Sequence, residues 1–166
     1  IKATQILLLN GRFEDAKARA EGLLKTNPKD VDAMVLRANA MASLRDTAGA
    51  IADIEEALKL DPSSSAALVS MGSVRLRSGD AQQAEAAFRQ AIAVAPNDLD
   101  VRLALASFFM AAGRSAEAEQ TLNEVLAKEP KHLLANRLLS TLYVSSNRVA
   151  EAEQPLKVVA ESSNAP

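Results

Sequence analysis

Residues that could carry out catalysis or bind a metal are scarce in this sequence of 166 residues. It contains no cysteine, which excludes a disulfide, a thiolate metal site and a cysteine nucleophile. Its one histidine, His132, supports neither a histidine metal cluster nor a Ser-His-Asp triad, and we interpret it as a solvated loop residue. The sequence also has no glycine-rich phosphate loop and no metal-binding motif. We therefore expect a protein that is not an enzyme and that needs no metal ion or cofactor.

Two further groups of residues that could form a site are explained by the elements that carry them. Four glutamates fall early in predicted helices, where a carboxylate complements the helix dipole: Glu117, Glu119, Glu151 and Glu153. Phe108 and Phe109 are predicted to lie in the core, because the interleaved basic residues of a single-strand nucleic-acid site are lacking. Both groups indicate helices rather than chemistry.

Composition and charge exclude further classes of protein. The sequence is 48% hydrophobic, and its 19 Lys and Arg against 21 Asp and Glu give a net charge of −2, which disfavours nucleic-acid binding. No apolar run approaches the roughly 20 residues of a membrane-spanning helix, so we expect no direct insertion into a membrane. The length is that of a single helical domain, which we place at residues 1–166.

A repeat of 34 residues organises the whole chain. Proline recurs at this spacing at Pro28, Pro62, Pro96 and Pro130, and alanine recurs at Ala16, Ala50, Ala84, Ala118 and Ala152. Glycine keeps the same phase at Gly11, Gly79 and Gly113, with Arg45 and Asn147 at the two remaining positions. We therefore divide the chain into repeats 1–30, 31–64, 65–98, 99–132 and 133–166.

Each repeat is predicted to contain two helices separated by a short break, because its apolar residues recur at intervals of three and four. Glycine or Asn147 at the break suits the left-handed conformation that ends the first helix, and Asp80 is placed to cap a second helix. The proline ends that second helix, and two residues later Asp30, Ser64 or Asp98 can cap the next one.

This pattern resembles the tetratricopeptide repeat over the entire chain. The resemblance is clearest at Met34, Ala38, Met41, Ala50, Ile54, Ala57 and Pro62 and at Leu68, Met71, Gly72, Ala84, Phe88, Ala91 and Pro96. It implies an all-α fold, a right-handed α-solenoid of five stacked helix-turn-helix repeats. Polar residues occupy four usually apolar positions, and we expect the arginines to form ion pairs or to reach solvent: Arg37, Arg75, Arg102 and Asn136.

The resemblance also implies that the first helices of the repeats line a concave groove that binds a peptide or protein segment. Three columns of residues fall on this surface: Ile1, Val35, Val69, Leu103 and Arg137; Gln5, Asn39, Ser73, Ser107 and Thr141; and Leu8, Ala42, Leu76, Met110 and Val144. With the charged residues beside them, they lead us to predict the following groove residues: Asp32, Val35, Asn39, Val69, Ser73, Leu76, Arg77, Asp100, Leu103, Ser107, Met110, Arg137 and Thr141. An extended peptide or an amphipathic helix could occupy such a groove.

Some members of the family hold the C-terminal carboxylate of a ligand with lysine and asparagine at fixed groove positions. Here the lysine positions hold Ile1, Val35, Val69 and Leu103, and Asn39 alone remains of the asparagines. The resemblance therefore implies a scaffold that binds a protein or peptide partner without this carboxylate clamp.

Two alternative functions are compatible with the same pattern. Apolar residues on the last predicted helix, Leu156, Val158 and Val159, favour a homo-oligomer through the terminal repeats or a spacer role in a larger assembly. The chain could instead be a non-catalytic arm of a bacterial envelope, secretion or polysaccharide-export system, because its alanine-rich, cysteine-free repeats are similar to bacterial arrays. A bacterial cytoplasmic or periplasmic location is open on this basis.

Both ends of the sequence differ from a complete array. Ile1 falls at about the fifth position of a repeat, so we expect the sequence to be a fragment of a longer protein. Pro155 lies inside the last predicted helix and is expected to kink it or to delay its start, at a cost of roughly 3 kcal/mol.

Overall fold

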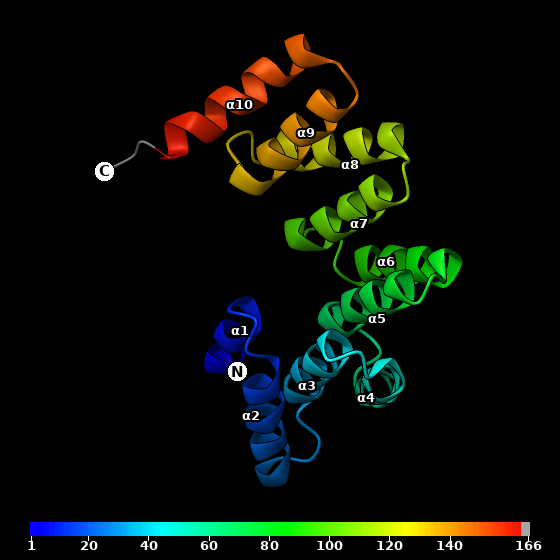
Figure 1. Cartoon of the computed structure of the whole chain (residues 1–166). Coiled ribbons are helices and arrows are strands. Elements are labelled where there is room, and N and C mark those ends of the chain that lie inside the picture. The colour runs from blue at the N-terminus through cyan, green and yellow to red at the C-terminus, as the bar shows by residue number, and fades with distance from the viewer. Residues whose placement is uncertain (164–166) are drawn as a thin grey trace. The chain divides into compact units, whose positions relative to one another are not determined.

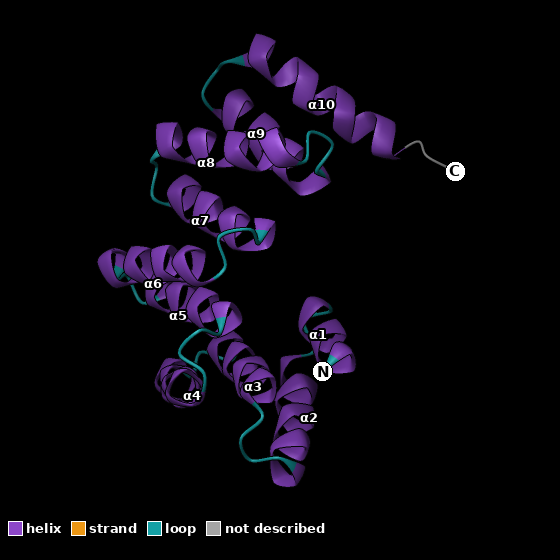
Figure 2. Cartoon of the chain, turned by 180° about the vertical axis from the view of Figure 1, so that it is seen from behind, coloured by secondary structure: helices purple, strands orange, loops and turns teal. Residues whose placement is uncertain are grey.

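The computed structural model describes residues 1–163, which form ten α-helices and no β-strand (Figure 1, Figure 2). The helices are α1 (Lys2–Leu9), α2 (Phe13–Thr26), α3 (Val31–Ser43), α4 (Thr47–Leu60), α5 (Ser65–Arg77), α6 (Ala81–Val94), α7 (Leu99–Ala111), α8 (Ser115–Lys128), α9 (Leu133–Ser145) and α10 (Val149–Ser163). Each predicted repeat contains one odd-numbered helix, called helix A below, followed by one even-numbered helix, called helix B. The predicted all-α fold of helix-turn-helix repeats is confirmed.

The chain divides into two compact units. Unit 1, Ile1–Pro96, contains α1 to α6, and unit 2 begins at Asn97 and contains α7 to α10. In unit 1, α3 packs against α2 and α4 and also contacts the neighbouring helices A, α1 and α5. In unit 2, α8 packs against both α7 and α9, and α7 contacts α9. Within each unit, helices A of successive repeats therefore lie side by side.

Local hydrogen bonds begin three helices where the sequence predicts. Asp30, Ser64 and Asp98 each accept a hydrogen bond from a backbone N–H in the first turn of the next helix A, at 3.0, 3.3 and 2.9 Å. The same role falls to His132, whose half-buried ring accepts a hydrogen bond at Nδ1 from the N–H of Ala135 at 3.3 Å. The interpretation of His132 as a solvated loop residue is therefore wrong, because its imidazole caps α9.

The breaks between helices A and B all contain a residue with positive φ. It is a glycine in three repeats and Asn147, at φ 58°, in the last one, as the sequence predicts. In the second repeat it is Arg45, at φ 68°, so that a side chain with a Cβ adopts a conformation that favours glycine.

Small and apolar residues at fixed repeat positions form the core. The five alanines of the recurring column are fully buried, and Phe108 and Phe109 are buried as predicted. In unit 1, Ile54 of α4 shares a buried cluster with Ala67 and Val74 of α5. A helix B therefore packs on the helix A of the following repeat, and this contact buries the apolar face of each.

The polar residues at usually apolar positions all have partners. The three arginines form ion pairs with carboxylates on helices B, as predicted: Arg37 with Asp53, Arg75 with Glu55, and Arg102 with Glu124. The amide of Asn136 donates hydrogen bonds to the carbonyl oxygens of Pro130 and His132, at 3.1 and 3.0 Å. These groups can be partly or fully buried because each is satisfied.

Helix α10 runs through Pro155. It begins at Val149, the repeat position at which α8 begins at Ser115, so the expected delay of its start is wrong. Proline removes the N–H that would bond to the carbonyl oxygen of Glu151, and Glu151 is exposed, so water can bond to that oxygen instead.

Candidate functional site

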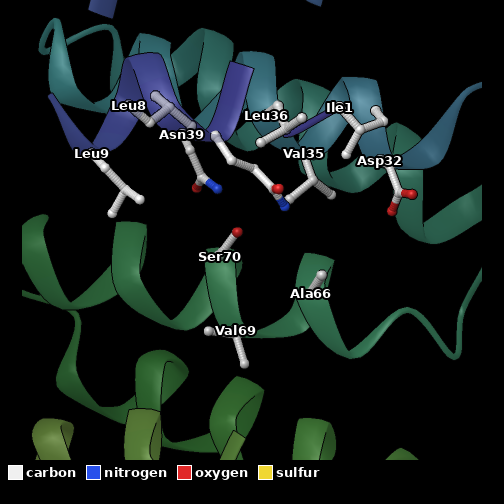
Figure 3. Close-up of a pocket in the computed structure, with 11 residues that line it drawn as sticks. Ile1, Leu8, Leu9, Asp32, Val35, Leu36, Asn39, Ala66, Val69 and Ser70 are labelled. Carbon is white, nitrogen blue, oxygen red and sulfur yellow. The ribbon is translucent and has the colours of Figure 1, made fainter. Parts of the chain in front are cut away.

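The helices A of unit 1 line a pocket of about 560 Å³, called the A-helix pocket below (Figure 3). Its lining comes from α1 with the preceding residue, α3 and α5: Ile1, Gln5, Leu8, Leu9, Asp32, Val35, Leu36, Asn39, Ala66, Val69 and Ser70. Most of these side chains are apolar, and Asp32 is the one charged side chain among them. The pocket is thus an apolar surface with a few polar groups.

The lining residues of α3 place three kinds of group in a row. Asp32, Val35 and Asn39 are three and four residues apart, which spaces the carboxylate, the apolar side chain and the amide by about 4.5 and 6 Å along the helix axis. Asp32 lies at one end of the pocket, with Leu8 and Leu9 at the other (Figure 3). The side chain of Asn39 points into the space between α3 and α5, where Ser70 also points (Figure 3).

Asn39 differs in its hydrogen bonding from other polar residues at its repeat position. The hydroxyls of Ser73, Ser107 and Thr141 each donate to the carbonyl oxygen four residues earlier in their own helix, at 3.0, 2.8 and 2.9 Å. The half-buried side-chain amide of Asn39 makes no hydrogen bond to any residue in the described range 1–163. It keeps two donors and an acceptor for a ligand.

The pocket brings together four of the predicted groove residues, Asp32, Val35, Asn39 and Val69. Three more residues of the groove columns, Ile1, Gln5 and Leu8, line it with them. The remaining predicted residues of unit 1 lie on α5 outside this lining: Ser73, Leu76 and Arg77.

The other predicted groove residues belong to unit 2 and are not part of the A-helix pocket. They lie on the helices A of that unit: Asp100, Leu103, Ser107 and Met110 on α7, and Arg137 and Thr141 on α9. Leu103 is only 3% exposed and Met110 is half-buried, whereas the four polar residues are exposed. Leu103 therefore has little surface for a ligand.

Four lining residues were not among the residues chosen from the sequence: Leu9, Leu36, Ala66 and Ser70. A signal for two of them exists in the repeat, because Ala66 follows Asp32 by 34 residues and Ser70 follows Leu36 by the same distance. A column containing Leu36 and Ser70 has no consistent polarity, so the pattern alone does not distinguish a pocket wall from the core.

The charged residues of the helices A fall into two groups. Arg37, Arg75 and Arg102 form ion pairs with helices B. The charged residues predicted to face the groove form no ion pair with any residue from 1 to 163: Asp32, Arg77, Asp100 and Arg137. They remain available for charges on another molecule.

A second polar cluster lies in unit 2. Tyr143 of α9 donates a hydrogen bond to Glu119 of α8 at 2.9 Å, and Arg148 donates to both oxygens of the same carboxylate. The hydrogen bond from Arg148 lowers the pKa of Glu119, and burial, followed by the bond to Glu119, raises the pKa of Tyr143. Because each of these groups has a partner, the cluster joins successive repeats and does not leave groups free for a ligand.

Features of a metal site or a membrane span are lacking in the part of the chain that the structure describes. No group of three or more His, Cys, Asp and Glu side chains is placed there to hold a metal ion. None of its helices is both long enough and apolar enough to cross a membrane.

The fold and the pocket define a class of all-helical repeat proteins in which helices A form the ligand-accessible side. Sequence profiles of the tetratricopeptide repeat match residues 5–65 and residues 75–139. The chain belongs to the tetratricopeptide repeat family, as its 34-residue columns predict. Repeats of this family commonly mediate protein–protein interactions, and the proteins that contain them are generally non-catalytic scaffolds.

Solved structures with the same fold cover nearly all of the chain. A thermophilic TPR protein of Thermus thermophilus superposes with a TM-score of 0.82 at 23% identity, covering 97% of this chain and 88% of that one. PilW, a type IV pilus biogenesis factor, gives 0.78 at 21% identity over 99% and 76%. MamA from Desulfovibrio magneticus RS-1 gives 0.70 at 20% identity over 99% and 94%. No curated protein sequence matches the chain significantly. At these identities the likeness concerns the fold alone.

Proposed function

We propose that this chain is a non-catalytic scaffold that binds an extended segment of a partner protein in the A-helix pocket. One observation carries the proposal. Helices A of three successive repeats line a single pocket of about 560 Å³, in which apolar side chains surround an amide, Asn39, that has no partner among the described residues. A half-buried amide without a hydrogen bond is costly unless a ligand satisfies it.

The geometry suits a peptide backbone. The Asn39 amide can donate one hydrogen bond to a peptide carbonyl and accept one from a peptide N–H. Val35 and Val69 lie beside it on α3 and α5 and give an apolar side chain of the peptide a surface on which to pack. Affinity then comes from burial of that side chain, and the position of the peptide is set by the amide.

Binding of synthetic peptides, selected from a displayed random library against the full chain, tests this function by calorimetry. We expect Asn39→Ala to weaken binding about tenfold, because the peptide loses its hydrogen bonds. Val69→Asp places a charge on the apolar surface and should weaken binding at least as much. Val69 is half-buried, which makes it a safer position for this change than Leu103, which is buried in unit 2.

Ser73→Ala is the matched control. Ser73 lies one turn after Val69 on α5, outside the pocket lining, and its hydroxyl is already bonded within the helix. Peptide binding that is equal in all three variants and in the unchanged chain would place the site elsewhere.

A second candidate function is association with another copy of the chain through α10. Leu156 is 46% exposed, whereas Ile54 and Leu122, at the same repeat position in α4 and α8, are fully buried. Ile54 is covered by the helix A of the next repeat, so Leu156 presents the same kind of surface to a helix A of a second copy. Sedimentation over a range of concentrations tests this candidate. A chain that is monomeric throughout, with Leu156→Asp behaving identically, would contradict it.

A further inference from the structure

The charge inside the A-helix pocket has one sign. Asp32 is the single charged side chain of the lining, and no lysine, arginine or histidine is among the lining residues. Asp32 is exposed in the first turn of α3 and forms no ion pair with the described residues. Its carboxylate therefore carries a negative charge that no side chain of the lining neutralises.

We infer that the A-helix pocket selects extended peptides in which a lysine or arginine lies two residues from an aliphatic residue. This inference rests on the proposed function, because it states which peptide that site prefers. The aliphatic side chain packs on Val35 and Val69, and the cation reaches the carboxylate of Asp32.

The spacing of the groups sets the spacing of the motif. Residues i and i+2 of an extended chain lie on the same face, about 6.6 Å apart. The carboxyl-bearing residue Asp32 is about 4.5 Å from Val35 along the axis of α3, a distance that such a pair spans with the flexible side chain of lysine or arginine. Asn39, about 6 Å beyond Val35 on the other side, then meets the peptide backbone.

The complementary charge also explains which ligands the pocket disfavours. A C-terminal carboxylate or an acidic side chain would lie near Asp32 with no cation from the lining to offset the repulsion. The pocket therefore favours an internal basic segment over an acidic tail.

Selection of a random peptide library on the full chain, followed by sequencing, tests the inference. We expect enrichment of lysine or arginine two positions from leucine, isoleucine, valine or methionine. For a selected synthetic peptide, Asp32→Asn should weaken binding about two- to fivefold, as for an exposed ion pair, and raised salt should reduce this difference. Replacing the basic residue of the peptide by glutamine should abolish the effect of Asp32→Asn.

Glu14→Gln is the matched control. Glu14 is also an exposed carboxylate in the first turn of a helix of unit 1 and forms no ion pair with residues 1–163, but it lies on α2 outside the pocket. Its replacement has the same effect on helix dipole and net charge and should leave peptide affinity unchanged.

The outcomes separate this inference from the function on which it rests. Selected peptides that depend on Asn39 but bind equally well to Asp32→Asn would overturn the inference and leave the proposed function in place. Enrichment of acidic residues, or of a cation three or four positions from the aliphatic residue as in a helix, would also overturn it. A library from which the unchanged chain enriches no peptide would overturn both.

Discussion

The guanidinium of Arg37 on α3 donates two hydrogen bonds to the carboxylate of Asp53 on α4, at 2.6 and 2.7 Å. This ion pair joins the two helices of one repeat at a position that the family usually fills with an apolar residue. Both side chains are half-buried, with 28% of Arg37 and 15% of Asp53 exposed, and the hydrogen bond to Asp53 raises the pKa of Arg37. A bidentate pair can replace an apolar contact here because each charge has its partner.

Removal of one partner of this pair should destabilise the fold. We expect Arg37→Ala to lower the free energy of unfolding by about 1–3 kcal/mol, because it leaves the carboxylate of Asp53 partly buried without its donor. The double replacement Arg37→Met with Asp53→Leu should recover most of this loss, as an apolar pair fills the same space. Urea denaturation followed by circular dichroism measures these differences. Arg12→Ala serves as the control, because the Arg12–Asp15 pair is more than half exposed. An equal effect of the two arginine variants would show that the Arg37–Asp53 pair adds nothing.

Two helical glycines should respond to alanine with opposite signs. A Cβ added to Gly72 would lie 2.8 Å from ring carbons of Phe88, which is itself only 3% exposed, whereas a Cβ added to Gly22 meets no atom within 4 Å. Alanine is favoured over glycine in a helix by about 1 kcal/mol, so Gly22→Ala should stabilise the chain by up to that amount. Gly72→Ala should destabilise it by about 1 kcal/mol, because overpacking exceeds the gain in propensity. Thermal or urea unfolding compares them, and stabilisation by both would contradict the close approach of α5 to the Phe88 ring.

The turn at Arg45 holds a residue with a Cβ at φ 68°. Glycine adopts this conformation without the steric cost of about 1–2 kcal/mol that other residues bear, and glycine stands at the equivalent position in three of the repeats. We therefore expect Arg45→Gly to raise the free energy of unfolding by about 1 kcal/mol. The control Arg45→Ala keeps the Cβ and should give no such gain. Equal stabilities of Arg45→Gly and the unchanged chain would show that the turn is not strained.

The ionisation of Tyr143 should report the polar cluster of unit 2. Tyr143 is the only tyrosine and the chain has no tryptophan, so ultraviolet absorbance follows its deprotonation without interference. Burial and the hydrogen bond to Glu119 raise its pKa, which we expect to lie above the ordinary value of about 10. Because the folded-state pKa is the higher one, the stabilisation is complete below about pH 10 and is lost as the pH rises through the folded value. In Glu119→Gln the tyrosine pKa should move down towards 10, while Glu153→Gln, on exposed surface of α10, should leave it unchanged. A tyrosine pKa that is the same in all three proteins would contradict the link to Glu119.

Several features that depend on neighbouring residues could be predicted from the sequence. The helix pairs of each repeat, the caps at Asp30 and Ser64 and the left-handed turn at Asn147 all agree with the structure. Helical periodicity, capping and turn conformation involve residues within a few positions of one another, so a repeated pattern identifies them. The role of His132 was not predicted, because an imidazole is an unusual cap and its role is visible only in the contact with Ala135.

The sequence by itself determined the repeat, the helix order and the small set of residues that face the same side of the helices A. Only the tertiary structure decided that Asp32, Asn39 and Val69 share one pocket, that Asn39 has no partner among the described residues while Ser73 does, and that Leu103 is buried. The reason is physical. The periodicity of a helix fixes which way each side chain points, whereas a pocket arises from the distances between helices whose residues are 34 positions apart, and packing alone sets those distances.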